Sequence, residues 1–356
     1  MAKPHSSLSR QSVLRIGFIP LCDAAPLIVA AQTGLFRAAG LRVELSREIG
    51  WASIYEKLLR GELDFAHALG PMPIAAGISS GGKKGGCKGL MVLNRNGNGI
   101  TLSQRLREEG VVDSASFADY VFQRAWEKPA ALGIVAPYSS HARLFREWLA
   151  PYKLKEGRHY HLATIPPQQF LRHLEAGTLL GACVGEPWNS IAVSRGLGFC
   201  VAVSTEIAPG HPEKVLACHG RHCEPDVRED TLAAVTAILE ACRVCATPDF
   251  LEELVQLVGK RHYLNLPTED LRRSFEGSFD RKFQGETPQP FVSFYGAGVN
   301  AVSPDDRRWL AECVPSEFGD NGISEALLAQ IYPPEVFKIA HQRLESQKPE
   351  IPAYEA

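Results

Sequence analysis

Five groups in this sequence follow predicted β-strands and together could hold a small anion. They are Trp51, Asn98, His141, the backbone of Gly185, and Lys214. An indole N–H, an amide, an imidazole, a backbone N–H and an ammonium group are all hydrogen-bond donors, and the ammonium carries a fixed positive charge. His141 also opens a predicted helix, whose N-terminus adds a partial positive field. This set suits binding of an anion better than it suits a reaction.

Each of these residues also has an ordinary structural explanation. Trp51 could be a core aromatic, and Asn98, between two glycines, could supply a left-handed turn. His141 could simply start its helix, and Lys214 could be a solvated surface cation. Only their common position, just after strands, favours the functional interpretation.

Two other motifs resemble those of nucleotide-binding sites, but the residues around them do not fit such sites. Residues 77–83 match the start of a phosphate-binding loop, but Lys84 replaces the Ser or Thr that would ligate Mg²⁺, and a helical pattern precedes them. Residues 296–301 resemble a dinucleotide fingerprint without the helix and the acidic residue that should follow. No convincing catalytic centre is present. We therefore expect a protein that is not an enzyme and uses no cofactor and no metal.

The nine cysteines do not suggest a disulfide framework, because their number is odd and they are spread over the chain. Cys242 and Cys245 lie inside a helical pattern, where redox or zinc pairs are unusual. Cys218, His219, His222 and Cys223 are spaced too tightly for a usual zinc site. We interpret them as buried or incidental residues in a reducing compartment.

The elements that must position the donors alternate between strand and helix. Strands are predicted at 13–21, 41–48, 63–68, 131–136, 160–165, 181–184 and 201–204, and helices at 26–40, 54–59, 141–150 and 168–176. From residue 229 the chain becomes mostly helical, with helices at 231–245, 249–258, 269–275, 305–313 and 324–330. This alternation predicts an α/β fold with two lobes and a ligand cleft beyond the strand ends.

Composition narrows the possible partners. The formal net charge of −2 provides no basic field for nucleic acid, and no apolar run is long enough for a membrane helix. Residues 1–20 lack the pattern of a secretory signal, so a cytoplasmic protein is expected if Met1 is native. We interpret residues 81–89 as a basic surface loop and residues 347–356 as a disordered tail.

Several long motifs in a fixed order resemble the nitrate- and bicarbonate-binding proteins of bacterial ABC transporters. They are GFIPLCDAAPLIVA, LSREIGWASIYEKL, GELDFAHALGPMPIA, LNRNGNGITLS, IPPQQF, CVGEPWN and HPEKVL, within residues 13–300. The resemblance implies a periplasmic-binding-protein-like fold with a hinged cleft and a helical C-terminal part. We expect lobe I to comprise residues 1–102 and 206–356, with a helical extension, and lobe II to comprise residues 103–205.

The resemblance also implies which residues hold the anion. The matching positions are Trp51, Asn98, His141, Pro167, Val184, Gly185 and Lys214. Asn98 departs from the glutamine of the nitrate-binding relatives and is one methylene shorter. Bicarbonate binders carry an acid at the position of Lys214 and recruit Ca²⁺, so a lysine favours nitrate or nitrite. On this basis Lys214→Glu should abolish nitrate binding and leave the fold intact.

The start of the chain resembles the cytosolic branch of this family, the nitrate/nitrite sensors of assimilation genes. Such a sensor sequesters an RNA-binding antiterminator of the NasT type and releases it when the anion binds. One alternative is a transport binding protein whose export signal precedes the sequence given. A second alternative is an enzyme related to the thiamine-pyrimidine synthases, although their cysteine-rich motif has no match here.

Overall fold

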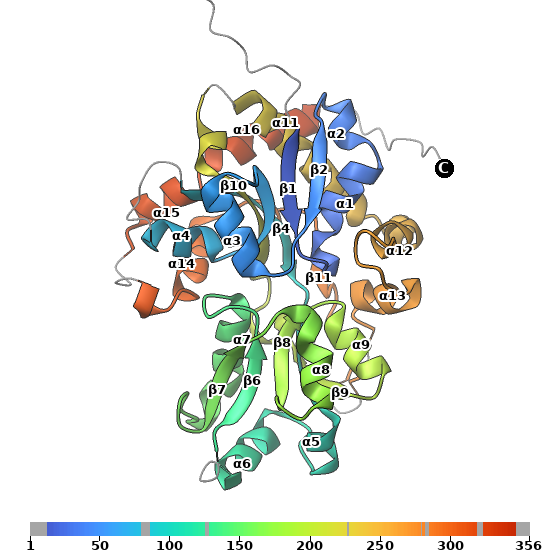
Figure 1. Cartoon of the computed structure of the whole chain (residues 1–356), viewed down its shortest axis with the longest axis vertical. Helices are drawn as coiled ribbons and strands as arrows, with labels where there is room; N and C mark the ends of the chain where they lie inside the picture. Colours follow the sequence, from blue (N-terminus) through green and yellow to red (C-terminus); the bar gives the residue numbers. More distant parts are fainter. Residues whose placement is uncertain are drawn as a thin grey trace, which may run out of the picture.

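The computed structural model describes residues 13–79, 86–124, 128–225, 228–278, 280–281, 285–318 and 323–346. Two β-sheets, each flanked by helices, form two lobes stacked along the long axis of the molecule (Figure 1). The predicted α/β, two-lobed architecture is therefore confirmed.

Lobe I contains a six-stranded sheet in the order β11-β4-β10-β3-β1-β2. The strands are β1 (Leu14–Phe18), β2 (Val43–Arg47), β3 (Phe65–Leu69), β4 (Cys87–Asn96), β10 (Pro212–His219) and β11 (Val292–Ser293). The first three run parallel, whereas β10 is antiparallel to both β3 and β4. The sheet is thus completed by a strand that returns from the second lobe.

Lobe II contains a five-stranded sheet in the order β7-β6-β8-β5-β9. The strands are β5 (Asn98–Ser103), β6 (Ala130–Ile134), β7 (Tyr160–Thr164), β8 (Gly181–Gly185) and β9 (Gly198–Val203). Because β5 belongs to this sheet, the predicted division after residue 102 is wrong. Asn96 (φ 57°) and Gly97 (φ 88°) adopt left-handed conformations that separate β4 from β5, and the chain changes lobe there.

The helices cover the faces of the two sheets. They are α1 (Ala25–Gln32), α2 (Leu35–Ala38), α3 (Trp51–Arg60), α4 (Met72–Ser79), α5 (Gln104–Glu108), α6 (Ser114–Arg124), α7 (Ser140–Leu149), α8 (Phe170–Glu175), α9 (Trp188–Ser194), α10 (Ser204–Ile207), α11 (Arg228–Cys245), α12 (Leu251–Gly259), α13 (Thr268–Glu276), α14 (Pro304–Glu312), α15 (Glu325–Ile331) and α16 (Pro334–Ser346). Short 3₁₀ turns are η1 (Cys22–Ala24), η2 (Ala150–Tyr152), η3 (Pro167–Gln169), η4 (Gly220–Cys223), η5 (Pro248–Phe250) and η6 (Ser316–Phe318).

The helix predictions need correction in two respects. The stretch 26–40 is divided into α1 and α2, because Gly34 at the junction has a φ of 75°. Helices α5, α6, α9, α10 and α16 have no counterpart among the predicted helices. Strand β4 begins inside the predicted loop 81–89, and residues 81–85 and 347–356 lie outside the described residues.

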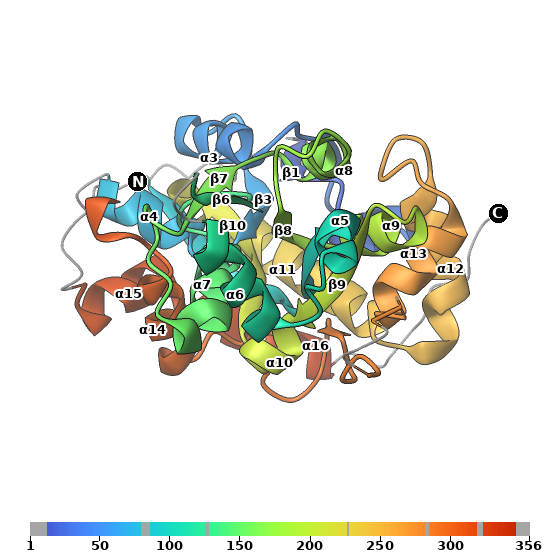
Figure 2. The same ribbon diagram turned by 90° about the horizontal axis from the view of Figure 1, so that it is seen from below.

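The C-terminal helices flank the molecule: α12 and α13 lie on one side, and α14 and α15 lie on the opposite side (Figures 1 and 2). Helix α13 packs against α9 of lobe II, so the C-terminal part contacts both lobes. One buried apolar cluster also includes residues of both lobes, among them Trp51 and Leu69 of lobe I and Val135 and Val184 of lobe II. The lobes are therefore closed on each other in this structure.

No single described helix is long and apolar enough to cross a membrane. Helices α11 and η5–α12 meet the length and composition criteria only as a pair, bent by 91°. Most residues of α11 are buried inside lobe I, which accounts for its apolar character.

Candidate functional site

Lys214 lies at the interface of the lobes and is completely buried. Its Nζ is 2.9 Å from Asp23 Oδ2 and 2.6 Å from Glu213 Oε1. The ammonium also lies 5.6 Å from the centre of the Trp51 ring. The surface-cation alternative is therefore wrong, and Lys214 lies in strand β10. Nor is it the only fixed charge at this position, because two carboxylates flank it.

Glu213 and Lys214 are consecutive residues in a strand, where side chains normally alternate between the two faces. Both nevertheless reach the same cluster, because β10 is irregular at this point. Pro212 pairs with Arg95 of β4 and Lys214 with the next residue, Asn94, so Glu213 is an extra residue without a partner on β4. On the side of β3, its backbone oxygen accepts a hydrogen bond from Gly70 N at 2.9 Å. A β-bulge of this kind redirects a side chain.

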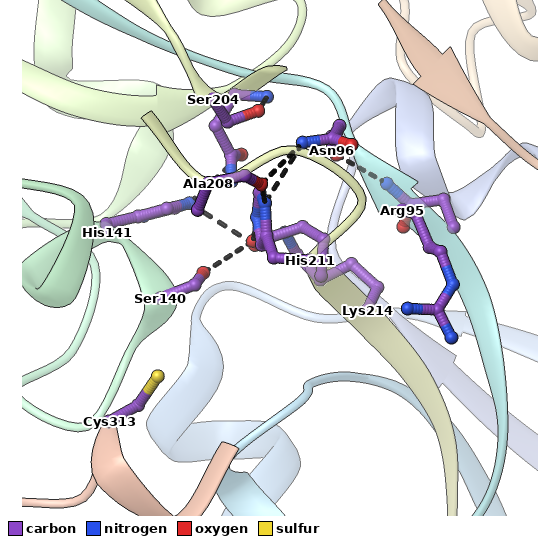
Figure 3. A network of polar contacts seen from close by, with 12 residues as sticks. Arg95, Asn96, Ser140, His141, Ser204, Ala208, His211, Lys214 and Cys313 are labelled. Carbon is purple, nitrogen blue, oxygen red and sulfur yellow. Dashed lines mark hydrogen bonds and ion pairs between the residues drawn. The ribbon is translucent and has the colours of Figure 1, made fainter. Parts of the chain in front are cut away.

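Glu213 connects lobe I to the start of helix α7 in lobe II. Its Oε2 accepts hydrogen bonds from Ser140 Oγ at 2.5 Å and from His211 Nε2 at 3.0 Å. Its Oε1 lies 3.5 Å from His141 Nε2. In Figure 3 the dashed lines from Ser140 and His141 converge beside His211, on the strand that carries Lys214.

Strands β5 and β8 bring further predicted residues of lobe II to this cluster. Asn98 Oδ1 lies 3.2 Å from His141 Nε2, and Asn98 pairs with Gly185 across the sheet. A Cβ on Gly185 would lie 3.4 Å from Asp23 Oδ2 and 3.6 Å from Asn98 Oδ1. A side chain at Gly185 would therefore point toward Asp23, and its neighbour Val184 belongs to the apolar cluster shared by both lobes.

Trp51 approaches the same cluster from the first turn of α3. Its ring lies 5.3 Å from the ring of His67, whose Nε2 is 2.9 Å from Asp23 Oδ1. Asp23 lies in η1, directly after the loop that follows β1. The structure thus gathers six of the seven predicted residues: Trp51, Asn98, His141, Val184, Gly185 and Lys214.

Pro167 is the exception. It is buried at the start of η3, and its carbonyl oxygen accepts a hydrogen bond from the backbone of Phe170. Among the described residues, no hydrogen bond joins Pro167 to the cleft residues.

Several polar atoms of the cleft have no hydrogen-bond partner among the described residues, although they are buried. They include the donors Trp51 Nε1 and Asn98 Nδ2, and the ring nitrogen His141 Nδ1. A buried donor without an acceptor costs about 1–3 kcal/mol. Unpaired donors near an ammonium group can bind an oxyanion, whose oxygens accept hydrogen bonds.

The charges of the cleft follow from burial and from ion pairing. Burial alone would raise the pKa of Asp23 and of Glu213, but Lys214 and the adjacent histidines outweigh it. The pKa of Asp23 is consequently lowered and that of Glu213 lies well below its usual range. Burial acts to lower the pKa of Lys214, but the two carboxylates raise it. The cleft therefore holds two carboxylates and one ammonium.

Burial also lowers the pKa of His141, and the contact with Glu213 opposes this effect without cancelling it. His141 is therefore neutral at pH 7 in this structure. Which of its nitrogens carries the hydrogen depends on the tautomer.

Glu186, at the end of β8, is a second buried glutamate with a different environment. Its Oε2 accepts a hydrogen bond from the backbone of Ser190 at 3.2 Å, and its Oε1 has no partner among the described residues. Burial raises the pKa of Glu186 to about 7. The backbone oxygen of Glu186 accepts a hydrogen bond from Cys22 N at 2.9 Å, which ties the two lobes together.

Sequence reasoning missed the acidic half of the site. Asp23 follows the first strand of the sheet, so its position matched the rule used for the donors. Glu213 is adjacent to Lys214, but strand alternation argues against a shared site, and only the bulge overrides that expectation. His67 and His211 lie in the motifs that carry the family resemblance, but no spacing in the sequence marked either histidine as a candidate site residue.

The other sequence motifs remain without a ligand-binding arrangement. Cys242 and Cys245 are buried in α11, and the Sγ atoms of Cys218 and Cys223 are 4.0 Å apart. Among the described residues, no group of His, Cys, Asp and Glu side chains could hold a metal ion. Helix α4 ends at Ser79, so the rest of the motif at 77–83 lies outside the described residues.

A model of the NMT1-like family matches residues 9–259. The bicarbonate transport ATP-binding protein CmpC of Synechococcus elongatus is 37% identical over 307 residues, which cover 83% of this chain and 44% of that protein. The nitrate/nitrite binding protein NrtA of the same species is 34% identical over 275 residues, 74% of this chain and 62% of that protein. The chain thus spans less than two thirds of these curated relatives.

The crystal structure of the periplasmic nitrate-binding protein NrtA from Synechocystis superposes with a TM-score of 0.84 at 24% sequence identity, covering 94% of this chain and 89% of that one. This likeness confirms the predicted periplasmic-binding-protein-like fold. Together with the sequence matches, it confirms the predicted resemblance to the nitrate- and bicarbonate-binding proteins.

Proposed function

This chain belongs to the NMT1-like family, and we propose that it binds nitrate or nitrite in the cleft between its lobes. The observation that carries the proposal is the pair of buried donors, Trp51 Nε1 and Asn98 Nδ2, that lack acceptors beside Lys214. Nitrate and nitrite present only acceptor oxygens, so either ion satisfies these donors without adding a donor of its own.

Bicarbonate is the competing ligand, because curated relatives include bicarbonate transport proteins. Its O–H needs an acceptor, and Glu213 or Asp23 would have to supply one. In this structure both oxygens of Glu213 already accept hydrogen bonds, and Asp23 Oδ2 pairs with Lys214. Asp23 Oδ1, 2.9 Å from His67 Nε2, has no hydrogen-bond partner among the described residues and remains available to the O–H of bicarbonate. The support for nitrate or nitrite over bicarbonate is therefore the set of unpaired donors beside the lysine at position 214.

The test is a thermal-unfolding series of the full chain with nitrate, nitrite, and bicarbonate with Ca²⁺. At about 100 times its dissociation constant, a ligand stabilises the folded state by roughly 2.7 kcal/mol. We expect an increase in melting temperature of several degrees with nitrate or nitrite. No increase with either ion would contradict the proposal, and an increase with bicarbonate alone would reassign the ligand.

We further propose that the chain serves as the solute-binding component of an ABC uptake system for this anion. The support is the sequence similarity to NrtA, a nitrate/nitrite binding protein, and to ATP-binding components of nitrate and bicarbonate transport. Deletion of the gene should then lower nitrate uptake from dilute medium. Unchanged uptake would contradict a delivery role.

A second candidate role is a non-enzymatic cytoplasmic sensor that holds a NasT-type antiterminator and releases it when the anion binds. One observation favours it: relatives at 36–37% identity are ATP-binding proteins in which the matching segment is under half of the chain. A similar segment therefore occurs within a chain whose name also describes ATP binding. In such a chain, a segment that binds the anion is better suited to regulating the protein than to delivering the anion to a transporter.

Two measurements separate these roles. A purified antiterminator of this type should co-elute with the protein without nitrate and dissociate when nitrate is added, if the protein is a sensor. Cell fractionation should then find the protein in the cytoplasm. Absence of any complex, together with reduced uptake in the deletion strain, would favour the delivery role.

A further inference from the structure

The cleft cluster, defined as Asp23, His67, His141, His211, Glu213 and Lys214, carries more negative than positive charge. Its two carboxylates face one ammonium group, and every member is at most 6% exposed. Among the described residues, Lys214 is the only permanently charged cation that pairs with either carboxylate. Counting only its carboxylates and its ammonium group, the cluster thus has one more negative than positive charge before an anion enters.

A bound monoanion would add a second surplus charge at the same buried position. Uncompensated charges in a protein interior are costly, so groups there take up or release protons to avoid them. Three imidazoles lie next to the carboxylates: His67 with Asp23 at 2.9 Å, and His211 and His141 with Glu213 at 3.0 and 3.5 Å. Imidazole is the side chain that gains a proton most readily near neutral pH.

We propose that the cleft binds its anion together with a proton, which His141 holds between the anion and Glu213. This inference rests on the proposed binding of nitrate or nitrite in the cleft. The juxtaposition that carries it is a histidine from lobe II that faces a carboxylate of lobe I and has one free ring nitrogen.

His141 fits this role better than His211, and unlike His67 it comes from lobe II and faces a carboxylate of lobe I. Its Nε2 already faces Glu213 and Asn98, so a hydrogen there has acceptors, while Nδ1 has no partner among the described residues. In the neutral ring Nδ1 then presents a lone pair, which repels an anion, and a proton converts it into a donor. The Nδ1 of His211, by contrast, already contacts Asn96 Nδ2 and the oxygen of Ala208.

The charged and polar groups around His141 come from several elements of both lobes. Glu213 and Lys214 face it from β10, Asp23 from η1, Asn98 from β5, and Ser140 precedes it in α7. Without the anion, burial and Lys214 keep the ring neutral, and the carboxylates oppose them. An anion next to Nδ1 adds negative charge, which favours the protonated ring.

The experiment is titration calorimetry of the full chain with nitrate at pH 6, 7 and 8. Each titration is repeated in two buffers with different heats of ionisation, so that the protons taken up can be counted. We expect about one proton per nitrate at pH 7–8, and a dissociation constant that rises up to tenfold per pH unit there.

The variant Glu213→Gln removes one negative charge from the cleft. We expect it to lose most of the proton uptake and to bind nitrate more tightly than the wild type at pH 8. The matched control is Glu48→Gln, another buried carboxylate of lobe I, whose partners are Ser46, Ser53 and Lys57. Proton uptake should be unchanged in this control.

Equal affinity at pH 6 and pH 8, with no buffer dependence of the heat, would overturn the proposal even if Glu213→Gln fails to fold. A requirement for added Na⁺ or Ca²⁺ in place of protons would overturn it as well. No heat with nitrate at any pH would instead contradict the proposed function, and this inference would fall with it.

Discussion

Two buried ionic networks of lobe I lie close together and are built differently. In the first, Arg95 forms ion pairs with both carboxylate oxygens of Asp306 and donates to the carbonyl oxygens of Val299, Gly210, Gly298 and Ala301. In the second, the cleft cluster, carboxylates outnumber the permanent cations, and donors beside it remain without acceptors. Arg95 and Lys214 lie on neighbouring strands of one sheet.

The difference shows how structural and ligand-binding ion pairs can be distinguished. Arg95 uses its guanidinium group fully, and Asp306 also caps helix α14 by accepting from Ser303 and donating its own N–H to Ser303 Oγ. A saturated network has no capacity for a ligand. The cleft keeps hydrogen-bond donors without acceptors, and these lower the free energy of unfolding until a ligand binds to them.

Lys214→Glu should give the largest effect, because it would place a third carboxylate beside Asp23 and Glu213. We expect loss of nitrate binding and a loss of folding free energy on the order of 3–5 kcal/mol. This corrects the expectation from the sequence that the fold would remain intact. Chemical denaturation and calorimetry measure both effects, and an unchanged denaturation midpoint would contradict the correction.

Asp306→Ala breaks the saturated network instead. It removes the partner of Arg95 and the cap of α14, so we expect a destabilisation of about 3–4 kcal/mol. Nitrate affinity of the folded fraction should stay within about twofold of the wild type, since no ligand donor is lost. A large loss of affinity would show that the two networks act as one.

Glu186→Gln tests a buried carboxyl that lacks the cationic partner of Glu213. Because burial raises its pKa to about 7, the folded state binds a proton more tightly than the unfolded state. The wild type should therefore lose stability as pH rises from about 4.5 to 7, by about 2–3 kcal/mol, and regain none above. We expect Glu186→Gln to raise the melting temperature at pH 8 and to leave it nearly unchanged at pH 4.5.

Trp51→Phe should give the smallest effect on the fold and a selective effect on binding. It removes the buried Nε1–H that lacks an acceptor, which favours the folded state, but it also removes buried ring atoms, which disfavours it, so the net change in stability should be small. Nitrate affinity should fall about 5–30-fold, or about 1–2 kcal/mol. Trp148→Phe is the control, because Trp148 packs between Phe117 and Phe145 in lobe II. Equal losses in both variants would exclude Trp51 as a ligand donor.

The fold could be predicted from the sequence to the level of two lobes, most helices and seven of the eleven described strands, whereas β4, β5, β10 and β11 were missed. Strand–helix alternation is a local signal, and it is strong wherever apolar runs end at glycine or proline. The point at which the chain changes lobe was misplaced, because a single residue, Gly97, separates strand β4 from strand β5. The left-handed conformations of Asn96 and Gly97 divide these strands between the two sheets.

The donors of the site could be predicted because they occupy strand ends within recognisable motifs. The partners of Lys214 could not, since its neutralisation by Asp23 and Glu213 depends on lobe closure and on a local irregularity of β10. Burial also changes the chemistry of a residue without changing the sequence around it. Glu186 and Glu213 are the same amino acid, yet one holds its proton near neutral pH and the other does not.

The bulge at Glu213 has an evolutionary consequence. The extra residue in β10 lets the side chains of Glu213 and Lys214 lie on the same face of the sheet. Their positions in the cleft therefore depend on how β10 is aligned with β4 as well as on the identity of the two residues. Deleting a single codon would turn one of the pair to the other face of the sheet and change the charge of the cleft in one step. Ligand preference in such a protein can therefore change by an insertion or deletion as abruptly as by a substitution, and sequence alignments that tolerate a gap here would hide the event.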